Sequence, residues 1–355
     1  MYKVLIHPAN YDNCREAVDK AFELFPQEVK NKKVLVKPNA LRASSADEAV
    51  VTHPAVIRAV VEKLEELMAS EIIVGDNPGM VSYGDNEKTF KQSGLMEASK
   101  GYYQNIGSDS QKVDFNPEFL NQVNISRAVM ETDLIISVPK FKTHGLTVIT
   151  GAIKNSYGII PGALKANLHY RSGSSIKFNQ IIIDVFSLRI PDMFIMDAVV
   201  GMEGNGPASP DLRDIGRILA SDNAVAMDAV MARMMGLDPQ ILPFLRIAKE
   251  RGLGDYEESS IELIGDLIVI PDFKYPPGLQ RTEAVVPGME QFFLSRINMR
   301  PKADPDLCTG CGTCVEQCPA SALSIEDTIP EVDKDLCVAC FCCQEICPEM
   351  AITLQ

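Results

Sequence analysis

The chain has 355 residues, of which 46% are hydrophobic, and it carries a formal net charge of −14. This is the composition of a globular protein with enough apolar residues for a large core, and the length predicts about two or three structural units. The negative charge argues against nonspecific nucleic-acid binding, which needs a basic face for phosphate, so we expect no nucleic-acid partner. Since no apolar run reaches the length of a membrane-spanning helix and the first residues lack a signal-peptide pattern, we expect a cytoplasmic protein without membrane insertion.

Segments expected to be strands and helices alternate along the chain up to about residue 300. After a first strand within residues 1–11, apolar β-branched runs predict strands at residues 33–36, 71–74, 134–138, 194–196, 218–220 and 261–264. Helical periodicity predicts helices at residues 55–69, 224–235 and 242–251, and residues 181–186 fit either type. The alternation predicts an α/β fold with a largely parallel sheet and flanking helices over residues 1–299, in one domain or two subdomains.

Polar residues follow several of these strands. In open parallel sheets, ligands bind in the crevice beyond the carboxyl ends of the strands, so polar loops at these ends are expected to converge on one site. The candidates for binding a substrate or cofactor there are Lys37, Asn39, Asp76, Lys140, Lys142, Asp197 and Glu203. Asp197 and Glu203 are candidates for a general base or a metal ligand, and turn formation by Gly, Pro, Asn and Asp is the alternative.

Residues 134–183 form a basic window in this acidic chain. The window contains six Lys and Arg residues and no Asp or Glu. We interpret it as an anion pocket for a carboxylate or phosphate, in which lysines supply the charge and His144 and Lys154 are the candidate catalytic residues. Asn155 and His169 are further candidates for binding a small anionic ligand or an unidentified anionic cofactor. The alternatives are a basic face that docks the acidic C-terminal end of the chain, or a solvated surface.

Nine of the ten cysteines lie in the last 48 residues and form a repeat. In each run, three cysteines are separated by two residues, a fourth follows after three more, and a proline comes next. The runs are Cys308, Cys311, Cys314 and Cys318 with Pro319, and Cys337, Cys340, Cys343 and Cys347 with Pro348. A reducing cytoplasm disfavours disulfides, and structural zinc sites use cysteine pairs separated by a longer spacer, so the pattern favours iron–sulfur clusters.

In a two-cluster arrangement of this kind, the fourth cysteine of each run ligates the other cluster. We therefore expect two [4Fe–4S] clusters, the first on Cys308, Cys311, Cys314 and Cys347 and the second on Cys337, Cys340, Cys343 and Cys318. Cys342 is expected to be a spectator thiol, or alternatively a replacement ligand when a cluster is damaged. Residues 300–355 are predicted to form a small α+β domain, which resembles the bacterial dicluster ferredoxins.

The predicted C-terminal domain is strongly acidic. Residues 301–355 contain ten Asp and Glu residues and two Lys, a net charge of −8. Carboxylates around anionic clusters attract basic surfaces, so we expect a redox partner protein that donates or accepts electrons. Solubility is the simpler alternative.

Several stretches of the chain together resemble a known family. They are residues 37–39, 75–79, 139–144, 150–158 and 197–207. On these stretches, the chain is similar to the family called domain of unknown function 362, which is often fused to a dicluster ferredoxin. The resemblance implies an iron–sulfur protein of anaerobic metabolism, and it does not supply a reaction.

A second, fainter likeness is to the nickel-pincer lactate racemases. The cofactor-bearing stretch of that family has the order His, Lys, Pro-Gly and His. The same order occurs here in His144, Lys154, residues 161–162 and His169. The likeness implies that Lys154 anchors or contacts a cofactor, with His144 as an acid/base and His169 as a metal ligand. Residues 76–77 are Asp and Asn where that family has a further histidine.

Together these observations predict an iron–sulfur electron-transfer protein. The leading hypothesis is a ferredoxin-dependent oxidoreductase that acts on a small anionic substrate or cofactor. The alternatives are a non-enzymatic electron carrier or maturation factor that docks a partner protein, and nickel-pincer-like racemase or epimerase chemistry. An enzyme is expected to hold an enclosed pocket lined by Lys140, His144 and Lys154, whereas a docking module is expected to present them on a flat or convex face.

Overall fold

The structure is a computed structural model that describes residues 1–79, 86–277, 279 and 292–355. Its strands are β1 (Tyr2–Pro8), β2 (Lys33–Pro38), β3 (Glu71–Val74), β4 (Ser110–Asp114), β5 (Gln122–Ser126), β6 (Leu134–Val138), β7 (Lys140–His144), β8 (Val148–Ile149), β9 (Met193–Met202), β10 (Leu212–Ser221), β11 (Ile261–Ile264), β12 (Pro301–Ala303), β13 (Leu323–Glu326), β14 (Ile329–Val332) and β15 (Ile352–Leu354). Its helices are α1 (Cys14–Leu24), α2 (Pro54–Glu66), α3 (Asn86–Gln92), α4 (Leu95–Ala98), α5 (Arg127–Glu131), α6 (Gly151–Asn155), α7 (Leu164–Ser172), α8 (Ser175–Leu188), α9 (Ala224–Met234), α10 (Pro243–Glu250), α12 (Thr313–Glu316) and α13 (Cys342–Ile346).

Most of the elements expected from the sequence are present. The strands expected at residues 71–74, 134–138 and 261–264 coincide with β3, β6 and β11, and α2, α9 and α10 lie where helices were expected. Residues 181–186, which fit either type, are part of α8. Across the described ranges, no helix combines the length and the apolar character needed to cross a membrane.

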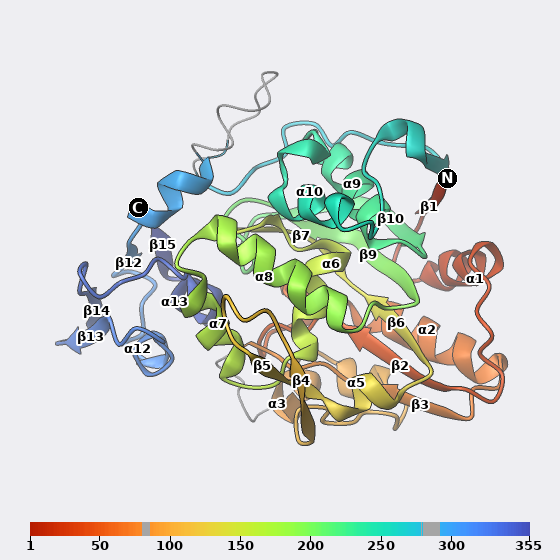
Figure 1. Cartoon of the computed structure of the whole chain (residues 1–355), viewed down its shortest axis with the longest axis horizontal. Helices are drawn as coiled ribbons and strands as arrows, with labels where there is room; N and C mark the ends of the chain where they lie inside the picture. Colours follow the sequence, from red (N-terminus) through yellow and green to blue (C-terminus); the bar gives the residue numbers. More distant parts are fainter. Residues whose placement is uncertain (80–85, 278, 280–291) are drawn as a thin grey trace.

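A mixed, largely parallel sheet forms the centre of the molecule (Figure 1). Among the described residues the strand order is β11-β1-β10-β9-β6-β2-β3, with β7 joined to the later half of β9 and to β8. Strands β9, β6, β2 and β3 run parallel, whereas β10 runs antiparallel to both of its neighbours. The fold is therefore of the α/β class that the sequence predicts, and the long antiparallel pair β9–β10 is an addition to it.

The alternation of side chains along the strands builds an apolar core on each face of the sheet. In β2, Leu35 packs into one core, whereas Val34 and Val36 pack into the other, as the two-residue period of a strand requires. Residues of α1 and α2 complete the core around Val34, and residues of α6, α8 and α9 complete the core around Leu35. The helix α6 is thereby held at the end of β6, where it can contribute to a site.

The C-terminal end of the chain folds into a small unit beside α7 (Figure 1). Strand β12 pairs with β15 and β13 with β14, both antiparallel. Equivalent positions of the two cysteine runs share a left-handed backbone, with φ of 67° and 76° at Gly310 and Gly312 and of 53° and 62° at Ala339 and Phe341. The repeat in the sequence is therefore also a repeat in the backbone.

Phe341 anchors the second cysteine run to the α/β region. A left-handed backbone costs about 1–2 kcal/mol at a residue with a Cβ, so this conformation needs compensation. The Phe341 ring is buried, and it packs so closely on Gly145 that an added Cβ there would lie 3.2 Å from ring carbon Cδ2. The guanidinium of Arg296 lies 5.9 Å from the ring centroid. Packing across the two regions thus offsets the local strain.

The segment expected to be a basic loop after β6 is instead the strand β7. All of its residues are buried, and Phe141 packs into the core around Leu35. The two-residue period of the strand places Lys140, Lys142 and His144 on the opposite side from Phe141. The chain therefore buries these basic side chains, which the sequence analysis placed in a polar loop.

Lys140 and Asp197 are paired residues of β7 and β9 and form a buried ion pair. The Lys140 Nζ lies 2.7 Å from Asp197 Oδ2, and neither side chain is exposed. The carboxylate also accepts the backbone N–H of His53 at 2.9 Å and the hydroxyl of Tyr11 at 3.3 Å. Burial lowers the pKa of Lys140, and Asp197 opposes that shift. The pair therefore ties β7 to β9.

Asp197→Asn should destabilise the fold by about 3–5 kcal/mol, because it leaves the Lys140 ammonium buried without a counter-charge. Anaerobic urea unfolding followed by circular dichroism measures the change. The control is Glu97→Gln, which removes the solvent-exposed ion pair of Glu97 with Arg58 and should cost less than about 1 kcal/mol. Equal losses in the two variants would contradict the stabilising role of the buried pair.

Candidate functional site

The eight cysteines of the two runs line two separate cavities. Cys308, Cys311, Cys314 and Cys347 line one cavity, named here the Cys308 cavity. Cys318, Cys337, Cys340 and Cys343 line the other cavity, named the Cys337 cavity. Each cavity thus collects three cysteines from one run and the fourth cysteine from the other.

Four cysteines line each cavity, and cysteine thiolates are the ligands that iron–sulfur clusters use. The backbone N–H groups of Ala322 and Ala351 donate to the Sγ atoms of Cys318 and Cys347 at 3.3 Å. Hydrogen bonds of this kind to sulfur set the potential of iron–sulfur clusters.

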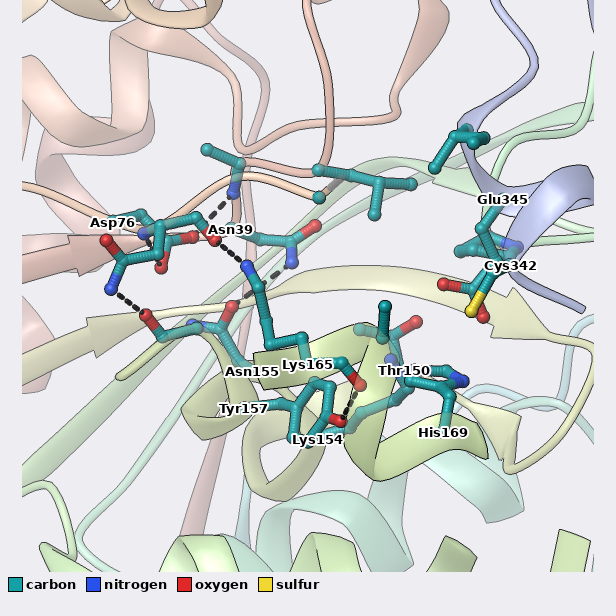
Figure 2. A pocket seen from close by; sticks show the side chains of 18 of the residues that line it. Asn39, Asp76, Thr150, Lys154, Asn155, Tyr157, Lys165, His169, Cys342 and Glu345 are labelled. Carbon is teal, nitrogen blue, oxygen red and sulfur yellow. Dashed lines mark hydrogen bonds between the residues drawn. The ribbon is translucent and has the colours of Figure 1, made fainter. Parts of the chain in front are cut away.

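A larger pocket lies between the α/β region and α13 (Figure 2). The ends of β2 and β3, the helices α6 and α7, and α13 supply its walls. Its polar lining residues are Asn39, Asp76, Asn77, Lys142, Thr150, Lys154, Asn155, Tyr157, Lys165, His169, Cys342 and Glu345. The structure therefore brings together six of the residues expected in a crevice, namely Asn39, Asp76, Lys142, Lys154, Asn155 and His169.

One side of the pocket is a hydrogen-bonded network around Asp76 (Figure 2). The Lys37 Nζ lies 2.7 Å from Asp76 Oδ1, and the N–H of Ala40 donates to Asp76 Oδ2 at 2.9 Å. The side chain of Asn39 donates to Asn155 Oδ1 at 3.1 Å, which joins the end of β2 to α6. Burial lowers the pKa of Lys37, and the charge of Asp76 opposes the shift. These charges balance each other and hold the wall in place.

The short helix α6 carries Lys154 into the pocket and is fixed by Asp228 of α9. The Asp228 carboxylate accepts the N–H groups of Ala152 at 2.6 Å and of Ile153 at 3.0 Å. An added Cβ on Gly151, whose φ is 58°, would clash with this carboxylate, so glycine is needed there. Burial raises the pKa of Asp228 to about 7, against the effect of the two N–H groups. Asp228 was not among the expected site residues, because its partners are backbone groups far away in the chain.

Lys154 lines the pocket beside two aromatic rings. Its Nζ lies 5.6 Å from the ring centroid of Tyr157 and 5.9 Å from that of Phe178. Among the described residues it makes no ion pair or hydrogen bond. Burial lowers the pKa of Lys154, and the more distant charges of Glu345 and Cys342 oppose the shift. An anion beside Lys154 would favour its charged form, so this side chain is placed to bind the anionic part of a ligand.

Lys165 also lines the pocket, but its amine already forms hydrogen bonds to the protein backbone. The Nζ donates to the carbonyl oxygen of Asn77 at 2.6 Å and to that of Pro78. Burial lowers the pKa of Lys165 to about 7. A neutral amine still has two N–H groups, enough for both carbonyls. Lys165 belongs to the basic window but was not among the expected site residues, because partners that are backbone carbonyls leave no signal in a sequence.

The opposite side of the pocket belongs to the C-terminal domain. Figure 2 shows Cys342 and Glu345 of α13 across the pocket from Asp76 and Asn39. The ring Nδ1 of His169 lies 3.2 Å from the carbonyl oxygen of Cys340, to which it donates. The same short segment thus supplies cysteines to the Cys337 cavity and a wall to the pocket.

His144 lies behind this wall and does not line the pocket, contrary to the catalytic role expected for it. Its Nδ1 accepts the N–H of Leu146 at 3.1 Å, and its Nε2 lies 3.1 Å from Glu345 Oε1. Burial lowers the pKa of His144 to about 3, so the ring is neutral. Burial alone would raise the pKa of Glu345, but His144, His169 and Lys154 bring it below its usual range. His144 therefore contacts α13 through a close approach that is not a hydrogen bond.

Lys140, Asp197 and Glu203 also lie outside the pocket, which corrects the expectation that they share one crevice. The first two form the buried pair between β7 and β9, and Glu203 pairs with Arg213 at 2.9 Å. Strand β9 extends to Met202, so Asp197 lies inside a strand and not in the loop after it. The short β-branched run at residues 194–196 did not reveal this length.

Comparisons with known proteins agree with this architecture. The family model described as "Domain of unknown function (DUF362)" matches residues 34–233, more than half of the chain. The chain belongs to the DUF362 family. A model of a 4Fe-4S dicluster domain matches residues 300–348. The C-terminal part of this DUF362 protein is therefore a ferredoxin-like iron–sulfur domain with a role in electron transfer.

Individual relatives of the DUF362 chain are known. The thylakoid-associated protein sll1697 of Synechocystis sp. is 28% identical over 229 residues, which cover 62% of this chain and 68% of that protein. A probable ferredoxin of Methanosarcina thermophila is 59% identical over 29 residues, 8% of this chain and 50% of that protein. A solved structure of a Thermotoga maritima protein has a TM-score of 0.38 and 13% identity, over 58% of this chain and 54% of that one, and this likeness carries no argument here.

Lys165→Met should remove a pH-dependent part of the stability of the DUF362 chain. An unfolded lysine keeps its proton up to about pH 10.4, whereas folded Lys165 loses its proton near pH 7. Between these values the unfolded state binds more protons, so the stability contributed by Lys165 rises with pH by up to about 1.4 kcal/mol per unit. Anaerobic urea unfolding measures the free energy of unfolding. The free energy of unfolding of the wild type should rise relative to that of Lys165→Met from about pH 7.5 to about pH 9.5.

The matched control for this experiment is Lys177→Met, which removes an exposed lysine paired with Glu118. This variant should follow the wild-type pH profile. Parallel profiles for wild type and Lys165→Met would show that the buried amine does not titrate in this range.

Proposed function

We propose that this DUF362 protein is a ferredoxin-dependent oxidoreductase that acts on a small anionic substrate or cofactor bound beside Lys154. The observation that carries the proposal is that one segment borders both sites. Cys340, Phe341 and Cys343 line the Cys337 cavity, and Cys342, Glu345 and Ile346 line the pocket. Electron transfer weakens steeply with distance, so a redox-active ligand is best placed directly beside a cluster-binding loop. The proposal keeps Lys154 as the central binding and catalytic residue and gives no catalytic role to His144.

The proposal assigns one [4Fe–4S] cluster to each cysteine cavity. The ligands in the Cys308 cavity are Cys308, Cys311, Cys314 and Cys347. The ligands in the Cys337 cavity are Cys337, Cys340, Cys343 and Cys318. Clusters of this type supply one-electron transfer at low potential when bound. Cys311 of the Cys308 cavity is exposed, whereas none of the four cysteines of the Cys337 cavity is. The Cys308 side is therefore suited to exchange electrons with a partner, and the Cys337 side, whose loop borders the pocket, with a ligand there.

Unsatisfied polar atoms in the pocket support a bound ligand. Within the described residues, the buried Thr150 Oγ1 and the Asn39 Oδ1 have no hydrogen-bond partner, and both residues line the pocket. Lys142 donates to the carbonyl oxygen of Val50 at 2.8 Å, and burial lowers its pKa well below its usual value. A ligand with an anionic group for Lys154 and polar groups for Thr150 and Asn39 would satisfy these atoms.

A redox partner protein with a basic surface fits the net charge of −8 on residues 301–355. A cytoplasmic location and a role in anaerobic metabolism complete the proposal, because both keep thiols reduced and low-potential clusters intact.

The geometry bears on the alternatives. A protein that only docks a partner would present Lys154 on a flat or convex face, whereas Lys154 lines a concave pocket. Racemase-like chemistry with His144 as the acid/base would need this side chain at the ligand, and His144 faces Glu345 instead. These positions favour the oxidoreductase.

Cys343→Ala should remove at least one cluster, leaving about four irons per chain or fewer in place of about eight. Cys342→Ala changes the adjacent cysteine, which lines the pocket and neither cysteine cavity, and it should keep about eight irons. Iron and acid-labile sulfide analysis after anaerobic purification measures both. Equal iron content in the two variants, or zinc in place of iron, would refute the ligand assignment.

A bound anion should change the electron paramagnetic resonance spectrum of the reduced protein, because it would lie next to the Cys337 loop. Oxalate and phosphate serve as probes. Lys154→Met should abolish the spectral change, whereas Lys177→Met, an exposed lysine of the same basic window, should keep it. A spectral change that survives in Lys154→Met, or reduced protein that no small oxo-acid perturbs or oxidises, would count against the oxidoreductase.

A further inference from the structure

The pocket beside Lys154 contains buried oxygen atoms that have no hydrogen-bond partner among the described residues. They are Asn39 Oδ1, Thr150 Oγ1 and Glu345 Oε1, and all three residues line the pocket. Thr150 is 3% exposed and Glu345 is 7% exposed. A buried polar atom without a hydrogen bond is costly, so these atoms indicate which groups a ligand of the pocket supplies.

The network at the end of β2 fixes Asn39 Oδ1 as an acceptor. An ammonium group can only donate, and the Lys37 Nζ lies 3.5 Å from Asn155 Oδ1, so the oxygen of the Asn155 amide faces Lys37. The Nδ2 of the same amide donates to Ser137 Oγ at 3.0 Å. Asn39 donates its own Nδ2 to Asn155 Oδ1 at 3.1 Å, which leaves Asn39 Oδ1 to accept a hydrogen bond from a ligand.

Glu345 provides a second acceptor, which belongs to the C-terminal domain. Its Oε1 lies 3.1 Å from His144 Nε2, but the two atoms do not form a hydrogen bond. Figure 2 shows Glu345 across the pocket from Asn39. The pocket therefore has acceptors on two sides. A carboxyl group forms its strongest hydrogen bonds with cationic donors, so the side of Glu345 is suited to a positively charged group.

Thr150 and Lys154 form the complementary part of the pocket. Thr150 directly precedes α6 and Lys154 lies four residues later, so their side chains share one face of this helix. Lys154 lies beside the rings of Tyr157 and Phe178 and, within the described residues, makes no ion pair. Its ammonium group and the Thr150 hydroxyl can both donate to a carboxylate.

We infer that the ligand of this pocket is a small polar amino acid, with its carboxylate at Lys154 and Thr150 and its ammonium group at Glu345. A side-chain N–H or O–H of the ligand then donates to Asn39. The inference rests on the proposed function, because it names the class of the anionic ligand bound beside Lys154. An anion with acceptor atoms alone would serve Lys154 and leave both Asn39 and Glu345 without donors. An ammonium group matches the carboxyl group in charge, which a hydroxyl group does not.

Calorimetric titrations of the full-length, anaerobically purified protein with its clusters test the inference. Three pairs of acids differ only in the 2-amino group, namely serine and 3-hydroxypropionate, asparagine and succinamate, and glutamine and glutaramate. Both enantiomers of each amino acid are used. At least one amino acid should bind at least about tenfold more tightly than its partner, because a site built for an N–H group rejects the analogue that lacks it. The corresponding 2-hydroxy acid should also bind at least about tenfold more weakly than this amino acid.

Smaller ratios in all three pairs, the absence of binding included, would overturn the inference. A 2-hydroxy acid that binds as tightly as the amino acid would do the same. These wild-type ratios decide whether or not a variant folds.

Glu345→Gln should remove the preference and leave the affinity for the partner acid within about twofold, because only the amino acid uses the negative charge of Glu345. Glu345→Asp, which keeps a carboxyl group, should retain a preference for the amino acid. Iron analysis checks that each variant keeps about eight irons. An unchanged preference in Glu345→Gln with its irons present would overturn the inference.

Lys154→Met separates this inference from the proposed function. It should abolish the binding of both members of each pair, and Lys177→Met, which removes an exposed lysine, should change neither. Paired acids that bind equally and both need Lys154 would leave the proposed anion site in place and overturn the amino-acid ligand. Binding that survives in Lys154→Met would refute the proposed site itself.

Discussion

The docking of residues 340–346 onto the α/β region is the interaction on which the rest of the structure depends. Phe341 packs on Gly145 in a left-handed conformation that a residue with a side chain adopts only at a cost. Gln344 donates to the carbonyl oxygen of Asn205 at 2.9 Å, and His169 donates to that of Cys340. Because this one segment supplies cysteines to a cavity and a wall to the pocket, its docking fixes the separation between the two sites. An electron-transfer protein needs such a fixed separation.

The lysines in and around the pocket differ in their partners, and this difference determines which of them can bind an anion. Lys37 is balanced by Asp76, and Lys140 by Asp197. Lys165 is held by backbone carbonyls, so it contributes to structure more than to ligand binding. Lys154 remains, in contact with aromatic rings and, among the described residues, without an ion pair. In a chain of net charge −14, this arrangement concentrates the capacity to bind an anion at one point beside the C-terminal domain.

The sequence predicts best what short-range chemistry determines. The spacing within each cysteine run fixes a tight loop, so the four-cysteine sets and the exchange of fourth cysteines could be predicted from the repeat. Uninterrupted β-branched runs such as residues 134–138 likewise predicted strands and a parallel sheet. Partners distant in the chain could not be predicted in the same way. The charges of residues 140–144 suggested a loop, because nothing nearby shows that Asp197 neutralises Lys140 inside the sheet. Asp228 escaped notice for the same reason, since its role comes from contacts that only the fold creates.

We propose that each cysteine cavity holds an iron–sulfur cluster with ligands from both runs, and that the cluster of the Cys337 cavity lies directly behind the pocket wall. The decisive experiment is a crystal structure of anaerobically purified protein, with anomalous diffraction data collected at the iron absorption edge. We expect two compact groups of iron atoms, one in each cavity, with the group in the Cys337 cavity adjoining α13. Single zinc ions at these positions, or iron held by all four cysteines of one run, would contradict it.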